Sequence, residues 1–226
     1  VIGCVSAVRH SADYAFLGYF IVLEEYQRRG IGTALFRTAL QHAGRERCIG
    51  LDGVVEQQSN YSRSGFAPCY DVLRFVGHGI TATNRTATNR TATNRTATNR
   101  TAPSLGDSCC CNRIVCISEV DFAEVVALDR KIHACERGPL LARLFAMPGV
   151  CVKACIDDTG SVLAYGALRP GADRPRIGPL VSPTRAMAHA LLEDLLLAGS
   201  VGPGDEYSMD VPAASLEGVA LAQTLS

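Results

Sequence analysis

The stretch Gln27-Arg28-Arg29-Gly30-Ile31-Gly32 decides how the first part of the chain folds, because it separates a strand-like segment from a helical one. Residues 15–23 before it are rich in β-branched and aromatic residues, which favours a strand. Residues 33–43 after it repeat apolar residues at helical spacing. Glycines let the backbone approach a ligand closely, and a helix N-terminus attracts anions. The stretch therefore predicts a strand, a loop suited to a pyrophosphate and a helix, although such a loop alone is also compatible with a simple tight helix entry.

The segments around this loop extend the pattern on both sides. The residues before it predict an antiparallel hairpin, and those after it predict further alternation of strands and helices. The predicted elements are strands at 1–8, 15–23, 49–55 and 66–76, and helices at 33–43 and 57–64, with the last strand bent or interrupted at Pro68.

Two motifs in this region resemble the GNAT superfamily of acyl-CoA N-acyltransferases. Gln27 to Gly32 is similar to the superfamily's Q/R-x-x-G-x-G/A signature, and Ile21-Val22-Leu23 resembles the strand before it. Tyr61-Ser62-Arg63-Ser64-Gly65-Phe66 resembles the Tyr-x-x-x-Gly-Phe that closes the same domain. The resemblance covers residues 1 to about 76. It implies an α/β fold with an α+β mixed sheet, acetyl-CoA as cosubstrate and transfer of an acetyl group to an amine acceptor.

The resemblance also assigns site residues. It implies that the backbone of the strand end pairs with the pantetheine arm and that the loop holds the pyrophosphate. The cofactor-binding residues expected are Ile21, Val22, Leu23, Gln27, Arg28, Arg29, Gly30, Ile31, Gly32 and Thr33.

Two further residues are candidates for proton transfer. The resemblance matches Tyr61 to the group that protonates the departing thiolate, and a phenol can donate to such a leaving group, but aromatic packing is the alternative role. Asp52 is the candidate base that deprotonates the amine. A structural turn role for Asp52, with a water relay as the base, is equally compatible with the sequence.

The resemblance begins at the family's third strand, so we expect an N-terminally truncated first copy. The first strand and the helices that line the acceptor site in the family would then be absent, which leaves the acceptor unidentified. A non-catalytic acyl-CoA-binding or regulatory protein is therefore the alternative function.

Residues 112–226 predict a second unit with the element order of a GNAT fold. Ile177-Gly178-Pro179-Leu180 and Asp210-Val211-Pro212 resemble the C-terminal GNAT-like domain of two-domain members. Between strand and helix, however, Ser182 to Ala188 contains no glycine. Because close backbone approach to a pyrophosphate is then lost, this copy is predicted not to hold CoA.

Between the two units lie four copies of Thr-Ala-Thr-Asn-Arg, from Thr81 to Arg100. The repeat has no large apolar residue to bury, which is typical of a solvated linker. The predicted organisation is a domain at 1–80, a linker at 81–111 and a domain at 112–226. The linker arginines either have no specific partner or give weak binding to a polyanion.

Composition excludes several classes of protein. The formal net charge of 0 argues against a specific nucleic-acid partner, and the longest apolar run is too short to span a membrane. Ten cysteines without a C-x-x-C pair predict no metal site and a reduced, cytoplasmic environment. His133 and His189 are isolated and are interpreted as structural or solvated. The oligomeric state is left open.

Overall fold

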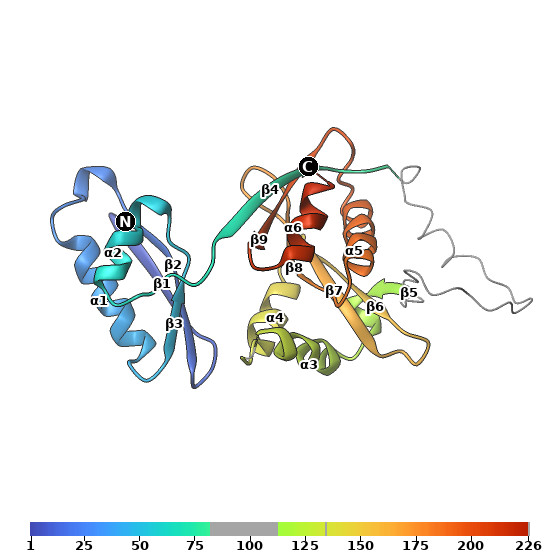
Figure 1. Cartoon of the computed structure of the whole chain (residues 1–226), viewed down its shortest axis with the longest axis horizontal. Helices are drawn as coiled ribbons and strands as arrows, with labels where there is room; N and C mark the ends of the chain where they lie inside the picture. Colours follow the sequence, from blue (N-terminus) through green and yellow to red (C-terminus); the bar gives the residue numbers. More distant parts are fainter. Residues whose placement is uncertain (82–112, 134, 226) are drawn as a thin grey trace, which may run out of the picture. The chain divides into compact units, whose positions relative to one another are not determined.

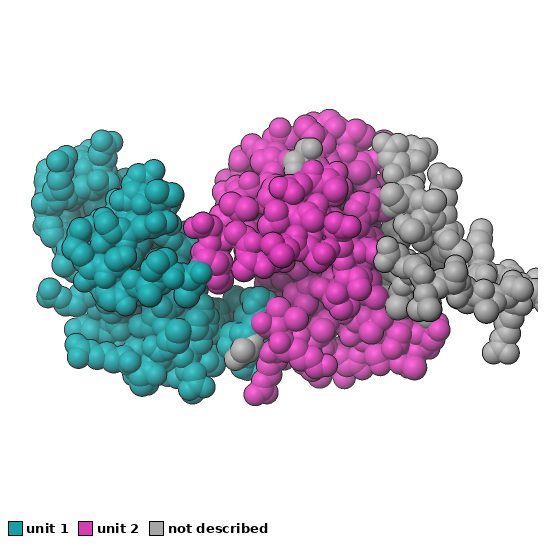
Figure 2. All heavy atoms as spheres, viewed as in Figure 1, with its two compact units in different colours: residues 1–69, 133–140 teal, residues 70–132, 141–226 magenta. Residues whose placement is uncertain are grey.

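The computed structural model describes residues 1–81, 113–133 and 135–225, which form two compact units. Unit 1 comprises Val1–Cys69 with His133–Leu140, and unit 2 comprises Tyr70–Ile132 with Leu141–Ser226 (Figure 2). Apart from Thr81, the predicted linker and the cysteine run at 109–111 lie outside the described residues.

Unit 1 is built on a three-stranded sheet in the order β1-β2-β3. Strands β1 (Gly3–Arg9) and β2 (Tyr14–Val22) form the predicted antiparallel hairpin, and β3 (Cys48–Leu51) runs parallel to β2 (Figure 1). Helix α1 (Ile31–Ala43) connects β2 to β3, as a parallel pair requires. Alternate residues of β2 face α1 and are buried with the small residues of its last turns: Ala15, Leu17, Ala39 and Ala43.

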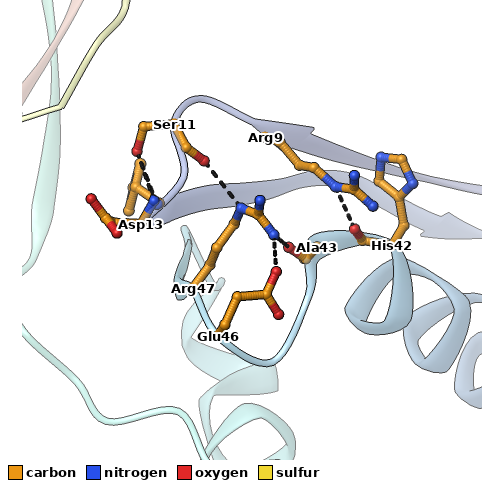
Figure 3. Close-up of polar contacts among 8 residues, drawn as sticks. Arg9, Ser11, Asp13, His42, Ala43, Glu46 and Arg47 are labelled. Carbon is orange, nitrogen blue, oxygen red and sulfur yellow. Dashed lines mark hydrogen bonds and ion pairs between the residues drawn. The ribbon is translucent and has the colours of Figure 1, made fainter.

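Polar contacts fix the C-terminal end of α1 against the hairpin turn (Figure 3). The Arg47 side chain donates from Nε to the Ser11 carbonyl (3.0 Å) and from Nη1 to the Ala43 carbonyl (3.1 Å). Arg9 Nε donates to the His42 carbonyl over 2.6 Å. Because cations at a helix C-terminus satisfy its last carbonyls and its dipole, these arginines hold α1 in place, with its N-terminus at the opposite end of the helix.

Short helical turns follow both strands of the parallel pair. The 3-10 turn η1 (Glu24–Tyr26) follows β2, and η2 (Val55–Gln57) leads into α2 (Gln58–Arg63). Strand β3 therefore ends four residues before the predicted limit at residue 55. The α2 region matches the predicted short helix, and Gly65 follows it with a φ of 94°.

Unit 2 contains a six-stranded sheet in the order β4-β9-β8-β7-β6-β5 (Figure 1). All neighbouring strands are antiparallel except β8 and β9, which are parallel. The strands are β4 (Val72–His78), β5 (Arg113–Cys116), β6 (Cys151–Ile156), β7 (Val162–Arg169), β8 (Arg176–Val181) and β9 (Glu206–Pro212). The helices are η5 (Ile117–Glu119), α3 (Phe122–His133), α4 (Gly138–Phe145), α5 (Arg185–Ala198) and α6 (Leu216–Gln223).

Separate hydrophobic clusters cover the two faces of this sheet. On one face, Leu192, Leu195 and Leu196 of α5 pack against alternate residues of β7, β8 and β9. On the other, Val125 of α3 packs with β6, β7 and the buried ring of Tyr165. From β5 onward, the order of strands and helices agrees with the sequence prediction.

Strand β4 corrects the prediction for residues 66–76. The sequence placed this strand last in the first unit, whereas it begins at Val72 and pairs with β9 over seven residues, from Val72↔Pro212 to His78↔Glu206. Directly after β4, the N–H groups of Gly79 and Ile80 donate to the carbonyls of Asp205 (2.9 Å) and Val201 (3.2 Å). The backbones lie so close there that a Cβ on Gly79 would be 2.2 Å from the Val201 oxygen. The N-terminal segment of unit 1 ends at Cys69, whereas the sequence placed the end of the first domain at residue 80.

No helix within the described residues is both long enough and apolar enough to cross a bilayer.

Candidate functional site

A cleft of about 730 Å³ opens in unit 1, where β2, the loop before α1, the end of β3 and α2 meet. Eight of the residues that the sequence predicts for the site line this cleft. These are Val22, Gln27, Arg28, Gly30, Gly32, Thr33, Asp52 and Tyr61.

One wall of the cleft is a strand edge that carries no neighbouring strand. The parallel pairing of β2 with β3 runs from Tyr14↔Cys48 to Leu17↔Leu51 and stops there, while β2 continues to Val22. Within the described residues, the last five residues of β2 therefore face the cleft with peptide groups that no strand pairs on that side. Such an edge can accept an extended ligand as an added strand.

A bulge shapes this edge. The register between β1 and β2 shifts between Cys4↔Ile21 and Ser6↔Gly18, so β2 has one residue more than β1 at this point. Tyr19 takes up the irregularity with a φ of 50°, and its carbonyl accepts a hydrogen bond from the Cys4 thiol. A bulge of this kind bends its strand and increases its local twist.

The N-terminus of α1 forms a second wall. Gly30 is its N-cap with a φ of 82°, and no side chain caps the helix. The first intrahelical bond runs from the Ala34 N–H to the Gly30 carbonyl (3.0 Å), so the N–H groups of residues 31–33 precede the helical ladder. The first turn contains no acidic residue. These free donors and the helix dipole make the position suited to an anion.

The loop before α1 is held by its own residues. Gln27 Nε2 donates to the Val22 carbonyl (3.0 Å), which ties the loop back to the end of β2. Arg28 adopts the left-handed region with a φ of 59°, and its side chain lines the cleft. The guanidinium of Arg29 lies 5.4 Å from the centre of the Tyr26 ring. The loop thus places one cation, Arg28, at the cleft.

Tyr61 reaches the cleft from α2 within an aromatic cluster. Its ring centre lies 5.9 Å from that of Phe36 and 6.4 Å from that of Phe66. The backbone of Gly53 also approaches the ring closely, because a Cβ there would lie 2.8 Å from Tyr61 Cδ2. Partial burial raises the pKa of Tyr61 above its ordinary value of 10.0, so the phenol keeps its proton at neutral pH. The ring is packed while the side chain still borders the cleft.

Asp52 follows β3 directly and borders the same cleft as Tyr61. Because β3 pairs with β2 only as far as Leu51, the next residue, Asp52, follows the point at which β2 loses its strand partner. The candidate acid and the candidate base are thus brought to one cavity.

Four predicted binding residues, namely Ile21, Leu23, Arg29 and Ile31, do not line this cleft. Successive side chains of a strand point to opposite faces, so the Ile21 side chain points away from the face that carries Phe20 and Val22. The prediction for Ile21 and Leu23 concerned their backbone rather than their side chains.

The sequence reasoning missed other residues of the cleft wall. Among them are Gly18 and Phe20 from β2, Phe36 from α1, and Asn60 and Arg63 from α2. Because Leu17 and Tyr19 line the cleft as well, a period-two pattern from Val22 does not single out the positions on β2. Asn60 directly precedes Tyr61 on α2, so helical spacing from Tyr61 does not indicate it either.

The corresponding helix start in unit 2 is closed by side chains. Thr184 is the N-cap of α5, and its hydroxyl accepts the Met187 N–H over 3.2 Å. The Ser182 hydroxyl in turn accepts the Thr184 N–H and donates to the Thr184 carbonyl. An amide that an anion would need is therefore already bonded. In the described parts of both units, no group of three His, Cys, Asp or Glu residues is arranged to hold a metal ion.

Comparison with known proteins identifies two regions of the chain. Residues 1–66 match the model of the Acetyltransferase (GNAT) family, and residues 125–226 match that of an Acetyltransferase (GNAT) domain. The chain is 27% identical over 215 residues to the holothin acyltransferase of Pseudoalteromonas sp. (strain SANK 73390), covering 95% of this chain and 63% of that protein. It is 22% identical to the uncharacterized N-acetyltransferase YitH of Bacillus subtilis, covering 87% of this chain and 60% of that protein.

The fold is also that of solved structures. A Pyrococcus horikoshii protein proposed to be an acetyltransferase superposes with a TM-score of 0.69 at 20% identity, covering 99% of this chain and 63% of that one. The chain thus spans less than two thirds of the length of these relatives. Two GNAT regions in sequence, each with a mixed α/β sheet, show that the chain belongs to the GNAT superfamily of acyltransferases.

Proposed function

We propose that unit 1 binds acetyl-CoA and transfers its acetyl group directly to an amine. The observation that carries the proposal is one cleft that joins an unpaired strand edge, an uncapped helix N-terminus and a protonated tyrosine. Each feature matches one part of an acyl-CoA: the amide-bearing arm, the pyrophosphate and the thioester. The membership in the GNAT superfamily supports the assignment.

The residues present fit the pyrophosphate and the arm. A Cβ at Gly30 would meet no atom within 4 Å, so the space over this residue is open to a ligand. The N–H groups of residues 31–33 and the Arg28 guanidinium would supply donors to phosphate oxygens. The peptide groups of β2 beyond Leu17 would pair with the amides of the pantetheine arm, as an added strand does.

The proposed chemistry needs three proton transfers. The amine nitrogen attacks the thioester carbonyl carbon, the carbon–sulfur bond breaks, and the Tyr61 phenol gives its proton to the sulfur. The nitrogen, which is positively charged once the new carbon–nitrogen bond has formed, then releases a proton through solvent, and this proton restores the Tyr61 phenol. The ammonium of the acceptor must first lose a proton, for which Asp52 or a chain of water molecules is the proposed base. No covalent bond to the enzyme forms in this scheme. Because acetyl-CoA is the cosubstrate, we place the protein in the cytoplasm.

The second part of the proposal concerns the identity of the amine acceptor. In this proposal unit 1 supplies the donor side of the reaction, and unit 2 shapes acceptor choice without holding CoA itself. The holothin acyltransferase relative is named for its acceptor, which makes small molecules a first class to test for this chain.

Release of free thiol from acetyl-CoA tests the transfer directly. The full chain is incubated with acetyl-CoA and a panel of amines, polyamines, amino acids and lysine peptides, and the thiol is measured with and without each amine. We expect amine-dependent release by the unmodified chain with at least one acceptor. The matched background is the Gly30→Glu variant, in which a carboxylate occupies the open space at the helix N-terminus.

Binding without transfer is the result that would contradict the proposal. If acetyl-CoA binds to the unmodified chain but no amine raises the thiol above the Gly30→Glu background, unit 1 is an acyl-CoA-binding module. If acetyl-CoA does not bind at all, the proposed donor site is wrong as well.

A further inference from the structure

Side chains of unit 2 leave a row of charges on one face of its sheet. Successive residues of a strand point to opposite faces. Leu168, Ile177 and Met209 all face α5 in the hydrophobic core, so their neighbours Arg169, Arg176 and Asp210 face the other side.

The strand register places these charges next to one another. Arg169 of β7 pairs with Arg176 of β8, and Arg176 pairs with Ser208 of β9. Asp210 lies two residues after Ser208 on the same face. Together with Arg74 of β4, which pairs with Asp210, three arginines and one aspartate occupy adjacent positions on four strands.

The carboxylate in this row, that of Asp210, already has a hydrogen-bond partner. Arg74 donates from Nε to Asp210 Oδ1 (2.7 Å) and from Nη2 to Oδ2 (2.8 Å), which is a bidentate pair. This pair lowers the pKa of Asp210, and the charges of Arg176 and Arg169 lower it further. Among the described residues, Asp210 makes its side-chain hydrogen bonds to Arg74 and none to Arg176 or Arg169. The row thus carries more positive than negative charge.

Arg169 and Arg176 have unsatisfied donors. Their Nε atoms are the two buried side-chain nitrogen or oxygen atoms without a hydrogen-bond partner among the described residues. Most buried polar groups in proteins are bonded, and an unsatisfied buried donor costs about 1–3 kcal/mol. Two adjacent guanidinium groups also repel each other. An arrangement of this kind is stabilised when an anion lies between the two groups.

The Arg169 guanidinium extends across β8. Its Nη2 atom would lie 3.8 Å from a Cβ at Gly178, so the absence of a side chain at Gly178 leaves room beside it. The neighbouring Arg174 differs from both, because it is already paired with Glu206 (2.6 Å) and Asp173 (3.3 Å). Arg169 and Arg176 therefore differ from Arg174, which already has acidic partners.

We propose that Arg169 and Arg176 bind an oxyanion, the phosphate or carboxylate group of a small molecule, on this face of unit 2. Two guanidinium groups present planar forks of donors that match such oxygens. The site is separate from the cleft of unit 1 and would give the glycine-free GNAT copy a ligand of its own.

Calorimetric titration of the full chain with inorganic phosphate, and separately with succinate, tests the site. Sodium chloride keeps the ionic strength constant, so that screening does not imitate binding. We expect saturable binding of at least one anion, and the two titrations distinguish a phosphate site from a carboxylate site. Arg169→Gln and Arg176→Gln should each weaken this binding about tenfold or more, since each removes charged hydrogen bonds.

Arg185→Gln is the matched control, because it removes the same charge from an exposed position at the start of α5. It should bind the anion like the unmodified chain. Thermal unfolding without anion provides a second readout, in which the Arg169→Gln and Arg176→Gln variants should be at least as stable as the unmodified chain. Absence of saturable binding, or unchanged affinity in both variants, would overturn the proposal. So would a loss of stability in both variants with unchanged anion binding, because the arginines would then be purely structural.

Discussion

The two GNAT regions of this chain differ at the point where a strand passes into a helix. In unit 1, Gly30 leads into α1 without a side-chain cap, and the first amides of the helix face a cleft. In unit 2, Thr184 caps α5, and Ser182 bonds to Thr184. A difference of a few residues thus distinguishes a helix N-terminus with N–H groups open to an anion from one with an N–H group already bonded to its own cap. The fold is shared, whereas the proposed difference in CoA binding depends on local backbone chemistry.

The largest effect is expected from Tyr61→Phe, which removes the phenolic proton and keeps the ring against Phe36. The acetyl-transfer rate should fall about 10²–10⁴-fold, as is typical for loss of a general acid, while acetyl-CoA affinity stays close to that of the unmodified chain. Steady-state rates and calorimetric titration measure the two quantities. Tyr70→Phe, at an exposed position outside the cleft, should have no effect. An unchanged rate in Tyr61→Phe would assign the ring to packing alone.

The next largest effect concerns the segment after β4, the strand that precedes the repeats in the chain but belongs to the sheet of unit 2. Gly79→Val should destabilise unit 2 by about 2–3 kcal/mol, because even a Cβ cannot fit against the Val201 carbonyl. Chemical denaturation measures this loss. Gly204→Ala is the control, since a Cβ there meets no atom within 4 Å. Equal stability of the two variants would contradict the close packing of the segment after β4 against the loop before β9.

Much of this arrangement was predicted from the sequence. The loop at Gln27 to Gly32, helix α1 and the missing glycine before α5 depend on neighbouring residues, so local patterns indicated them. The partner of β4 did not follow from local pattern, because residues 72–78 read as a strand whichever sheet they join. Phe20 and Asn60 were missed at the cleft for a similar reason: their role depends on how β2, β3 and α2 diverge.

A smaller effect tests the cap that distinguishes the second helix start. Thr184→Ala should lower the unfolding free energy by about 1 kcal/mol, since the Met187 N–H loses its acceptor. Ser215→Ala is the matched control, because Ser215 is the N-cap of α6 but makes no capping hydrogen bond. Denaturant titration compares the two variants. A loss in Ser215→Ala equal to that in Thr184→Ala would show that the Thr184 cap contributes nothing specific.

The smallest effect is the pH dependence of the pair between β4 and β9. Arg74 holds the pKa of Asp210 below its ordinary value, so the pair stabilises the fold above a pH of about 4. The contribution is lost as the pH falls through the lowered pKa of Asp210. It should stay below about 1 kcal/mol, because both side chains are partly exposed.

Unfolding of the unmodified chain and of Asp210→Asn between neutral and acidic pH measures this contribution. The difference in stability should shrink as the pH is lowered. A difference that grows toward acidic pH would contradict the sign of the shift.

The number of acetyl-CoA molecules bound per chain tests the contrast between the two helix starts most directly. Calorimetric titration of the full chain should give one site, which Gly30→Glu removes or weakens about a hundredfold because the carboxylate repels the pyrophosphate. Pro183→Glu, which places the same charge before α5, should leave the site unchanged. Two sites per chain, or a single site lost in Pro183→Glu and kept in Gly30→Glu, would contradict the account.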